Sequence, residues 1–272
     1  MNSIIDLKAY FNRIGYKDEA KPELETIKKL HLLHTQSIPF ENLNPLLGIP
    51  VELDLTSIQN KIIHQKRGGY CFEHNLLFTE VLKAIGFNAR PLAARVFSNR
   101  HESDITAKSH ALVLIELNHK KYIADTGFGG QSLTAPLQLI KDITQPTPHE
   151  NYRIIKREDY FILQVYLKGG WKTLYRFTLQ KRYLIDFKVA NWYTSTHPSS
   201  HFTYNLTVAI AKKGERHTLR NNIYRIHNNN TTVKEKLNSI QAIQKLLIEV
   251  FNLSLTHLPA LDEKLTSLIE EN

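Results

Sequence analysis

The stretch RGGYCFEHNLLF, residues 67–78, holds the only cysteine of the chain, between a glycine pair and the start of an apolar helical pattern. We predict a helix from about Cys71 to the residue before Gly86, because the apolar side chains recur at helical spacing and glycine commonly follows a helix end. A sulfur at a helix start faces unpaired backbone N–H groups and the positive end of the helix dipole, and both favour the thiolate. Cys71 is therefore a candidate nucleophile, with a small buried apolar residue as the alternative.

The hydrophobic period of the sequence changes once, after Gly86. Upstream the period is helical, and the predicted helices cover residues 7–14, 22–36 and 54–66. Downstream the apolar residues alternate, and the predicted strands cover residues 90–97, 109–117, 120–128 and a hairpin over 160–179 joined through Gly169-Gly170. We expect a loop over residues 191–202 and a late helix over residues 239–251.

These elements predict an α+β fold in three parts. We expect a helical bundle carrying the nucleophile over residues 1–87 and an antiparallel β part over residues 88–190. A smaller α/β part covers residues 191–272. With 272 residues and 42% apolar side chains, the chain can bury substantial cores without disulfides.

The composition also limits the compartment and the partners. One cysteine cannot form an intramolecular disulfide, and acids and bases are scattered through the first residues, which excludes an ordinary secretory signal. The sequence has no apolar run of about 18 residues, so we expect a cytoplasmic protein with no membrane partner. The net charge of +9 favours partners that carry phosphate, such as a phosphorylated cofactor. The basic residues are dispersed and match no nucleic-acid motif, so we expect no nucleic-acid partner.

A cysteine nucleophile needs a base and an orienting group, and the chain offers 13 histidines. His74 lies on the same helix as Cys71, which gives poor geometry for proton transfer. His110 begins a strand, and Asp125 follows on the next strand. If an even-length turn near Asn118-His119 joins these strands, His110 and Asp125 are diagonal neighbours on one face. An odd-length turn or a bulge separates them, and a histidine bonded only to backbone is the alternative.

Metal and phosphate motifs are weak in this sequence. Cys71 and His74 have C-x-x-H spacing, but a structural zinc site needs four ligands and no second pair lies nearby, so we predict no metal. The glycines of DTGFGGQS, residues 125–132, match neither nucleotide-binding loop pattern, and we expect them to form a tight turn.

Taken together, seven segments resemble the arylamine N-acetyltransferase family in order and near-family spacing. They are YFNRIGY (10–16), IPFENLNPLLG (38–48), RGGYCFEHNLLF (67–78), RV (95–96), SHALVLIEL (109–117), DTGFGG (125–130) and NWYTSTHPSSHF (191–202). The block around the cysteine is the most specific of them. The last 70 residues carry no recognisable motif.

The resemblance implies a fold and a chemistry. The fold is a helical bundle followed by a β-barrel and an α/β lid, around a core like that of the cysteine proteases. The implied catalytic triad is Cys71, His110 and Asp125. The implied reaction is a two-step transfer of acetyl from acetyl-CoA, a substrate used without metal, to the nitrogen of an aromatic amine or hydrazine, as in xenobiotic metabolism. Acetyl-Cys71 is the intermediate.

The resemblance also assigns residues around the triad. Phe40 and Phe128 correspond to pocket aromatics, with core packing as the alternative. The implied CoA-facing residues are Thr106, Tyr193 and Ser199. Glu41 and Arg67 are expected to form a buried structural ion pair, with Asn42 as a further member. The sequence departs from the family pattern at two positions. Thr126 stands where many members have an aliphatic residue. Ala107 stands where some members have glycine in the CoA-facing loop, and this difference affects the predicted CoA contacts.

Other functions remain open on the sequence alone. An amide synthase of macrolactam biosynthesis shares the scaffold and triad but uses no CoA. A Cys-His-Asp hydrolase or transglutaminase-like enzyme shares the geometry with peptide or glutamine substrates. A non-catalytic basic binding module is the last alternative.

Overall fold

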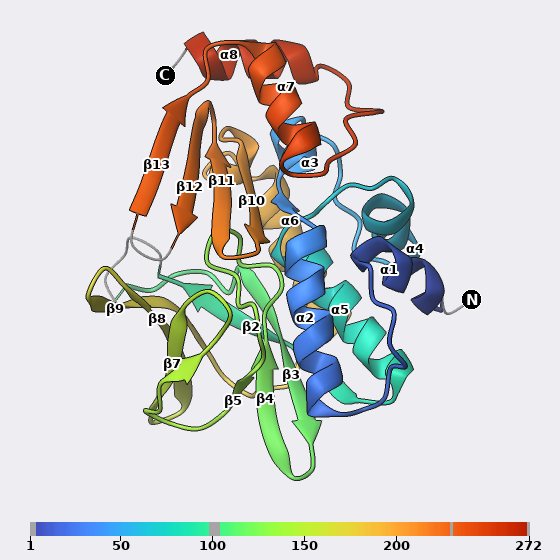
Figure 1. Ribbon diagram of the computed structural model, residues 1–272, viewed down its shortest axis with the longest axis vertical. Coiled ribbons are helices and arrows are strands. Elements are labelled where there is room, and N and C mark those ends of the chain that lie inside the picture. Colours follow the sequence, from blue (N-terminus) through green and yellow to red (C-terminus); the bar gives the residue numbers. More distant parts are fainter. Residues whose placement is uncertain (1–3, 98–103, 229–230, 271–272) are drawn as a thin grey trace.

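Two antiparallel sheets and a group of N-terminal helices build the computed structural model, which describes residues 4–97, 104–228 and 231–270 (Figure 1). The predicted α+β class is confirmed. The N-terminal helices are α1 (Leu7–Ile14), α2 (Leu24–Ser37), α3 (Leu43–Leu46), α4 (Leu55–Gln59) and α5 (Cys71–Ile85), and one π-helical turn spans Asn60–His64. Helix α5 begins at Cys71 and ends before Gly86, as predicted.

Local backbone geometry sets the ends of these helices. Gly15 and Gly86 take left-handed φ values of 71° and 106° just past α1 and α5. The helix predicted to reach Lys66 ends at His64, because Lys66 has a φ of 52° and cannot continue a right-handed helix. The helix predicted to open at Pro22 begins at Leu24, because Glu23 is extended.

The larger sheet curves into a nearly closed barrel with strand order β5-β4-β3-β2-β9-β8-β7-β6. Its strands are β2 (Asn88–Val96), β3 (His110–Leu117), β4 (Lys120–Ala124), β5 (Leu137–Gln138), β6 (Gln145–Pro146), β7 (Asn151–Arg157), β8 (Tyr160–Leu167) and β9 (Gly170–Phe177). One side chain joins the two outer strands: Gln145 accepts from the Gln138 N–H at 2.8 Å and donates to the Gln138 carbonyl at 2.9 Å.

Two hairpin turns fix the registers of the barrel. Strands β3 and β4 are joined by Asn118-His119, whose φ values of 50° and 61° suit a two-residue turn, and Val113 lies opposite Ala124. The even-length turn is therefore confirmed. The β8–β9 turn is Lys168-Gly169, not Gly169-Gly170, because the two left-handed residues are 168 and 169 and Gly170 already pairs with Leu167.

The smaller sheet has strand order β1-β10-β11-β12-β13 and begins with a strand from the N-terminal region. Its strands are β1 (Phe40–Glu41), β10 (Thr207–Lys212), β11 (Glu215–Arg220), β12 (Ile223–Asn228) and β13 (Thr231–Lys236). Helices α7 (Ile240–Glu249) and α8 (Leu261–Glu270) complete this end of the molecule (Figure 1). The late helix predicted over residues 239–251 is α7.

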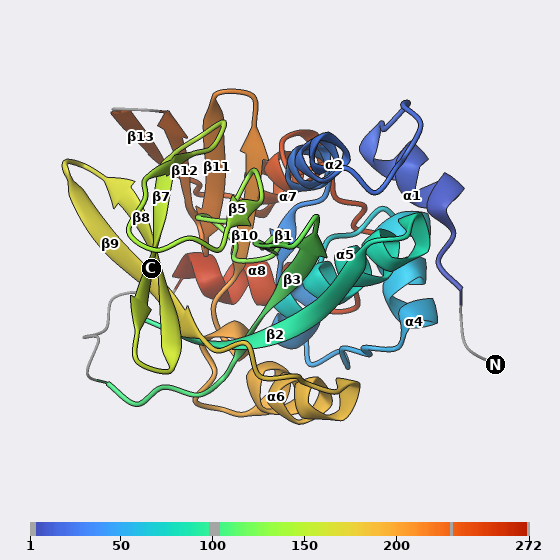
Figure 2. The same cartoon turned by 90° about the horizontal axis from the view of Figure 1, so that it is seen from below.

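The segment expected as a loop over residues 191–202 is mostly helical. Helix α6 (Leu184–Thr196) covers its first half, and a 3-10 turn spans His201–Thr203. The hydroxyl side chains that suggest a loop bond within the helix: Thr194 donates to the Ala190 carbonyl and Ser195 to the Asn191 carbonyl, both at 2.8 Å. Helix α6 (Figure 2) runs across the predicted boundary between residues 190 and 191. The division of the chain into three parts stays a prediction.

Buried apolar residues form a core in each region, and α5 packs against β2 and β3. The barrel and the smaller sheet are joined by a salt bridge. Arg216 on β11 is 3% exposed and bonds to Glu150 beside β7 with Nε–Oε1 and Nη2–Oε2 distances of 2.7 and 2.6 Å. Arg216 also donates to the Ser132 carbonyl at 2.9 Å.

Replacement of Arg216 by Met should lower the free energy of unfolding by about 3 kcal/mol, because a carboxylate in a buried pair loses its partner. Urea unfolding followed by circular dichroism measures this change. Lys83→Met is the matched control, since the Lys83–Glu80 pair is exposed and should contribute less than about 1 kcal/mol. Equal effects of the two variants would show that the Arg216 pair does not hold the sheets together.

Candidate active site

Cys71 occupies the first position of α5 and is 5% exposed. The helix start is capped by Glu73, which accepts from the Tyr70 N–H at 3.1 Å. The Cys71 Sγ lies 3.6 Å from the Ser109 carbonyl oxygen, so the residue before β3 contacts the sulfur. Gly127 packs against the same helix turn, and a Cβ there would lie 2.9 Å from the Cys71 Cα. Only glycine permits this approach. The sequence predicts a tight turn for these glycines, and the structure adds that Gly127 must lack a side chain because of its contact with α5.

The hairpin register places His110 at the start of β3 beside Asp125, which directly follows β4. The His110 Nε2 lies 2.7 Å from the Asp125 Oδ2, and both side chains are buried. The other ring nitrogen, Nδ1, is not engaged by Asp125, and Cys71 acts on the same ring and helps to raise its pKa. The structure therefore brings together the three residues that the sequence singles out.

The opposite charges of His110 and Asp125 determine the protonation states of the two side chains. Burial lowers the pKa of His110, but the Asp125 carboxylate and the hydrogen bonds to Asp125 and Cys71 outweigh it and raise the pKa to about 10. Burial raises the pKa of Asp125, but His110, Asn75 and the Gly127 N–H together lower it below its usual value. The histidine is therefore an imidazolium and the aspartate a carboxylate near neutral pH.

Asn75 is a site residue that the sequence reasoning missed. It lies four residues after Cys71 on α5, and its Nδ2 donates to Asp125 Oδ1 at 2.9 Å and to the Ala111 carbonyl at 2.7 Å. Its Oδ1 accepts from the Thr126 N–H at 3.0 Å. An asparagine one helical turn after the cysteine, next to an apolar stretch, is the sequence signal that could have indicated this residue.

His74 is occupied elsewhere. Its Nδ1 lies 2.8 Å from the Nε2 of His34, and its Nε2 lies 3.1 Å from the Pro39 carbonyl. Burial lowers the pKa of His74 to about 4, although hydrogen bonds to backbone carbonyls oppose this, so the ring is neutral. Both ring nitrogens of His74 are therefore used in contacts with α2 and with the loop at Pro39, and neither is available to the Cys71 sulfur.

The predicted ion pair is present beside the nucleophile loop. Arg67 donates to Glu41 Oε1 from Nε and Nη2 at 3.0 and 2.7 Å, and Lys61 bridges to Glu73 at 2.8 Å. Burial raises the pKa of Glu41, but Arg67 and Lys61 outweigh it and lower the pKa to about 2. The amide that joins the pair is Asn44, whose Oδ1 accepts from Arg67 at 3.0 Å.

Asn42 has a different set of partners from the expected one. Its Nδ2 donates to the carbonyls of Phe202 and Asn205 at 2.8 and 2.7 Å, and its Oδ1 accepts from the Thr207 N–H at 2.7 Å. Asn42 thus connects the loop before α3 to the start of β10.

The two aromatic residues lie near different members of the triad, Phe128 beside His110 and Phe40 in the apolar cluster of Cys71. Phe128 packs edge-on against His110, with ring centroids 5.1 Å apart, and also contacts Tyr175. Phe40 is buried in the cluster that contains Cys71, and its ring lies 6.0 Å from that of Phe202.

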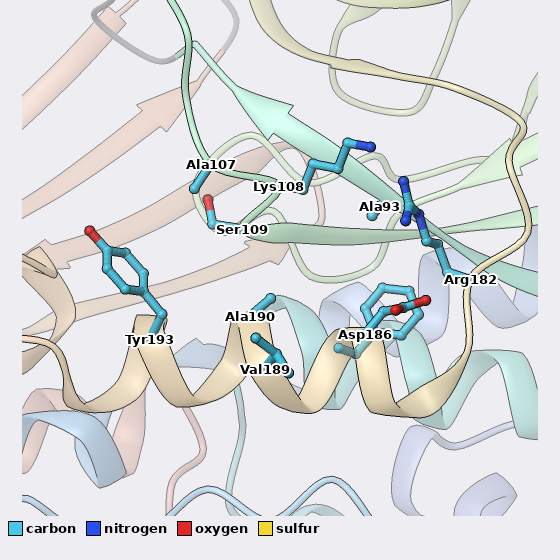
Figure 3. A pocket seen from close by; sticks show the side chains of 10 residues that line it. Ala93, Ala107, Lys108, Ser109, Arg182, Asp186, Val189, Ala190 and Tyr193 are labelled. Atoms are coloured by element: carbon cyan, nitrogen blue, oxygen red, sulfur yellow. The ribbon is translucent and has the colours of Figure 1, made fainter.

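A cavity of about 390 Å³ lies between α6 and the segment that leads into β3 (Figure 3). Ser109, which contacts the sulfur, lines this cavity together with Lys108, Arg182 and Tyr193. Burial lowers the pKa of Lys108, and the neighbouring Arg182 and Arg95 contribute to that shift, so cations are concentrated here.

Of the three predicted CoA-facing residues, Tyr193 lines this cavity. The Tyr193 hydroxyl lies 3.0 Å from the Ser199 Oγ, and the Tyr193 ring stacks on His197. The Thr106 carbonyl accepts from Arg95, and the adjacent Ala107 lines the cavity.

Within the described ranges, no group of three or more histidine, cysteine, aspartate or glutamate residues could hold a metal ion. None of the helices in the same ranges is long and apolar enough to cross a membrane.

A thiol at a helix start, paired with a buried histidine and carboxylate, is typical of enzymes that form covalent thioester intermediates. Comparison with known proteins specifies the class. A family model described as N-acetyltransferase matches residues 23–259. Arylamine N-acetyltransferase of Mycobacterium tuberculosis is 41% identical, covering 92% of this chain and 90% of that protein. The Escherichia coli enzyme of the same name is 37% identical, covering 91% and 88%.

Solved structures agree. The Mycobacterium marinum arylamine N-acetyltransferase in complex with CoA superposes with a TM-score of 0.93 at 33% identity, covering 98% of this chain and 99% of that chain. The chain belongs to the arylamine N-acetyltransferase family, and it is an acyltransferase enzyme.

Replacement of Asp125 by Asn should slow alkylation of Cys71 by iodoacetamide near neutral pH by about tenfold or more, since each unit of pKa is about tenfold in population. Without the carboxylate, burial lowers the pKa of His110 and only Cys71 opposes it, so the imidazolium beside the sulfur is disfavoured. In the unaltered enzyme the pKa of His110, about 10, keeps the ring an imidazolium near neutral pH. Because the chain has one cysteine, alkylation reports on Cys71 alone.

Asp142→Asn is the control for this measurement, because Asp142 is exposed and its φ of 60° suits asparagine. An unchanged alkylation profile in Asp125→Asn would contradict the ion-pair assignment.

Proposed function

We propose that Cys71, His110 and Asp125 form the catalytic triad of an arylamine N-acetyltransferase. The reaction moves acetyl from acetyl-CoA to the nitrogen of an aromatic amine or hydrazine through acetyl-Cys71. The observation that carries this proposal is the bond of 2.7 Å between His110 Nε2 and Asp125 Oδ2, which leaves Nδ1 for the thiol at the start of α5. Family membership supplies the acyl donor and the class of acceptor.

In the first step the Cys71 thiolate attacks the thioester carbonyl of acetyl-CoA. The new S–C bond forms at Sγ, the bond to the CoA sulfur breaks, and CoA leaves as a thiolate that takes the proton of the His110 imidazolium. Asp125 stabilises the imidazolium and holds the ring orientation. The exchange of one thioester for another is nearly isoenergetic, so loading needs no further energy source.

In the second step the amine nitrogen attacks acetyl-Cys71. Neutral His110 takes the proton of the attacking nitrogen, the C–S bond breaks, and the Cys71 thiolate is restored beside the imidazolium. The N–H groups in the first turn of α5 have no intrahelical acceptor, so they are suited to hold the oxyanion of both tetrahedral intermediates.

Phe40 and Phe128 supply flat apolar faces for an aromatic acceptor, and Phe128 contacts the His110 ring directly. Glu41, Arg67 and Asn42 act structurally by fixing the loops on either side of Cys71. A cytoplasmic location fits the enzyme, because a reducing compartment keeps a lone thiol available.

The cavity between α6 and residues 107–109 is the proposed site for the CoA part of the donor. Lys108 and Arg182 provide positive charge for phosphate groups, and the carbonyl of Ser109 connects the cavity to the sulfur. Tyr193 lines the same cavity, Ser199 supports its hydroxyl, and Thr106 lies in the adjoining segment.

Brief incubation with acetyl-CoA should raise the intact mass of the protein by one acetyl group, and an aromatic amine should then remove it. Cys71→Ala should show no gain. Mass spectrometry of the intact protein measures both steps. A folded protein that gains no acetyl group from acetyl-CoA would contradict the donor assignment and favour an amide synthase on the same scaffold.

Lys108→Ala and Arg182→Ala should each raise the KM for acetyl-CoA about two- to fivefold, the size expected for a partly exposed ion pair. Acetylation of the amine from a preformed acetyl-enzyme should be unchanged, because the CoA part has left. Steady-state and single-turnover kinetics separate the two effects. Lys188→Ala is the control, since Lys188 lies on α6 and lines a different cavity; an equal rise in KM for this variant would refute the assignment.

A further inference from the structure

A histidine from α2 contacts the backbone of Asp125. His31 is fully buried, and its Nε2 accepts from the Asp125 N–H at 3.1 Å. Strand β4 ends at Ala124, the last of its residues paired with β3. His31 therefore supplies an acceptor for Asp125 at the point where the strand ladder stops.

This hydrogen bond fixes the tautomer of His31. Because Nε2 accepts, the proton of the neutral ring lies on Nδ1. That atom is buried and has no hydrogen-bond partner among the residues that the structure describes. A buried donor without a partner costs about 1–3 kcal/mol, so an apolar side chain would serve better if His31 only filled space.

The ring stays neutral under ordinary conditions. Burial lowers the pKa of His31 to about 3, against the attraction of the Asp125 carboxylate. An imidazolium would have no lone pair for the Asp125 N–H. The acceptor is therefore present throughout the range in which the triad works.

Asp125 is held at both its backbone and its side chain. The N–H bonds to His31, and Oδ1 accepts from Asn75 Nδ2 at 2.9 Å and from the Gly127 N–H at 3.1 Å. Oδ2 is left for His110. The backbone position determines where the carboxylate projects from, so the bond to His31 controls the direction from which Oδ2 meets the imidazole.

We propose that His31 is a positioning residue for acetyl transfer, which holds the Asp125 backbone so that the carboxylate meets His110 and keeps the Cys71–His110 ion pair formed. This inference rests on the triad assigned under the proposed function. His31 itself touches neither the sulfur nor the reacting groups.

The chain offers a close comparison for a merely structural histidine. His34 is three residues further along α2 and equally buried, and its ring centroid also lies 5.6 Å from that of Phe78. Its hydrogen bonds go to Tyr10 and His74 at 2.8 Å each, away from Asp125. The two residues thus share helix, burial and packing and differ in their contact with the triad.

The test compares His31→Met and His31→Gln with His34→Met. Met and Gln have similar length, but only Gln carries an acceptor that can replace Nε2. In His31→Met, single-turnover acetylation of Cys71 near neutral pH should be about 10- to 100-fold slower, since a misplacement of about 1 Å can cost about 100-fold. The KM for acetyl-CoA should be unchanged, and the pH profile of Cys71 alkylation should move to higher pH.

His31→Gln should recover most of the rate and the alkylation profile. His34→Met should lower the melting temperature and keep the profile. The proposal is overturned if His31→Met keeps the alkylation profile of the unaltered enzyme, or if His34→Met shifts it equally. Should His31→Met fail to fold, His31→Leu is the second acceptor-free variant, and a profile shifted as much in His31→Gln as in His31→Leu also overturns it.

Alkylation by iodoacetamide needs neither acetyl-CoA nor an amine. A shifted alkylation profile in His31→Met therefore supports the positioning role even if acetyl-CoA proves not to be the donor. The absence of acetylation in the unaltered enzyme, by contrast, bears only on the proposed function.

Discussion

The charge of Asp125 is the constraint on which the rest of the site depends. A carboxylate removed from water is stable only if hydrogen bonds and an opposite charge replace its hydration. Asp125 is fully buried and receives these partners from three segments: Asn75 on α5, His110 on β3 and the Gly127 N–H of its own turn. Helix, barrel and loop must therefore be correctly packed before the carboxylate can exist there as an anion.

The start of α5 is fixed from several sides in the same way. Gly68 approaches the backbone of the β1 segment, where an added Cβ would lie 2.0 Å from the Pro39 carbonyl, and Gly127 approaches Cys71. The Tyr70 hydroxyl bonds to Asn191 on α6, whose amide donates to the Val51 carbonyl at 2.9 Å. The nucleophile therefore sits where the N-terminal helices, the barrel turn and α6 converge, which explains why the motifs are spread over so much of the chain.

The parts of this structure that depend on local signals could be predicted from the sequence. The change of hydrophobic period at Gly86 gives the order of helices and strands, and glycine gives the ends of α1 and α5. The meeting of His110 and Asp125 depended on one quantity, the turn length at Asn118-His119, and could be stated only conditionally. Residues whose role depends on packing between distant segments could not be found this way. Asn44 rather than Asn42 joins the ion pair, and His31 reaches Asp125 across 94 positions in the sequence.

The same carboxyl residue gives two buried histidines opposite protonation states. Burial disfavours the imidazolium at both His31 and His110, yet the pKa is about 3 at the first and about 10 at the second. Asp125 offers its backbone N–H to His31, a donor that only a neutral ring can accept, and its carboxylate to His110, an acceptor that a charged ring satisfies better. Burial alone would leave both rings neutral, so the cation needed beside a thiolate forms only where the carboxylate itself points. The orientation of Asp125 therefore decides which histidine can support a nucleophile.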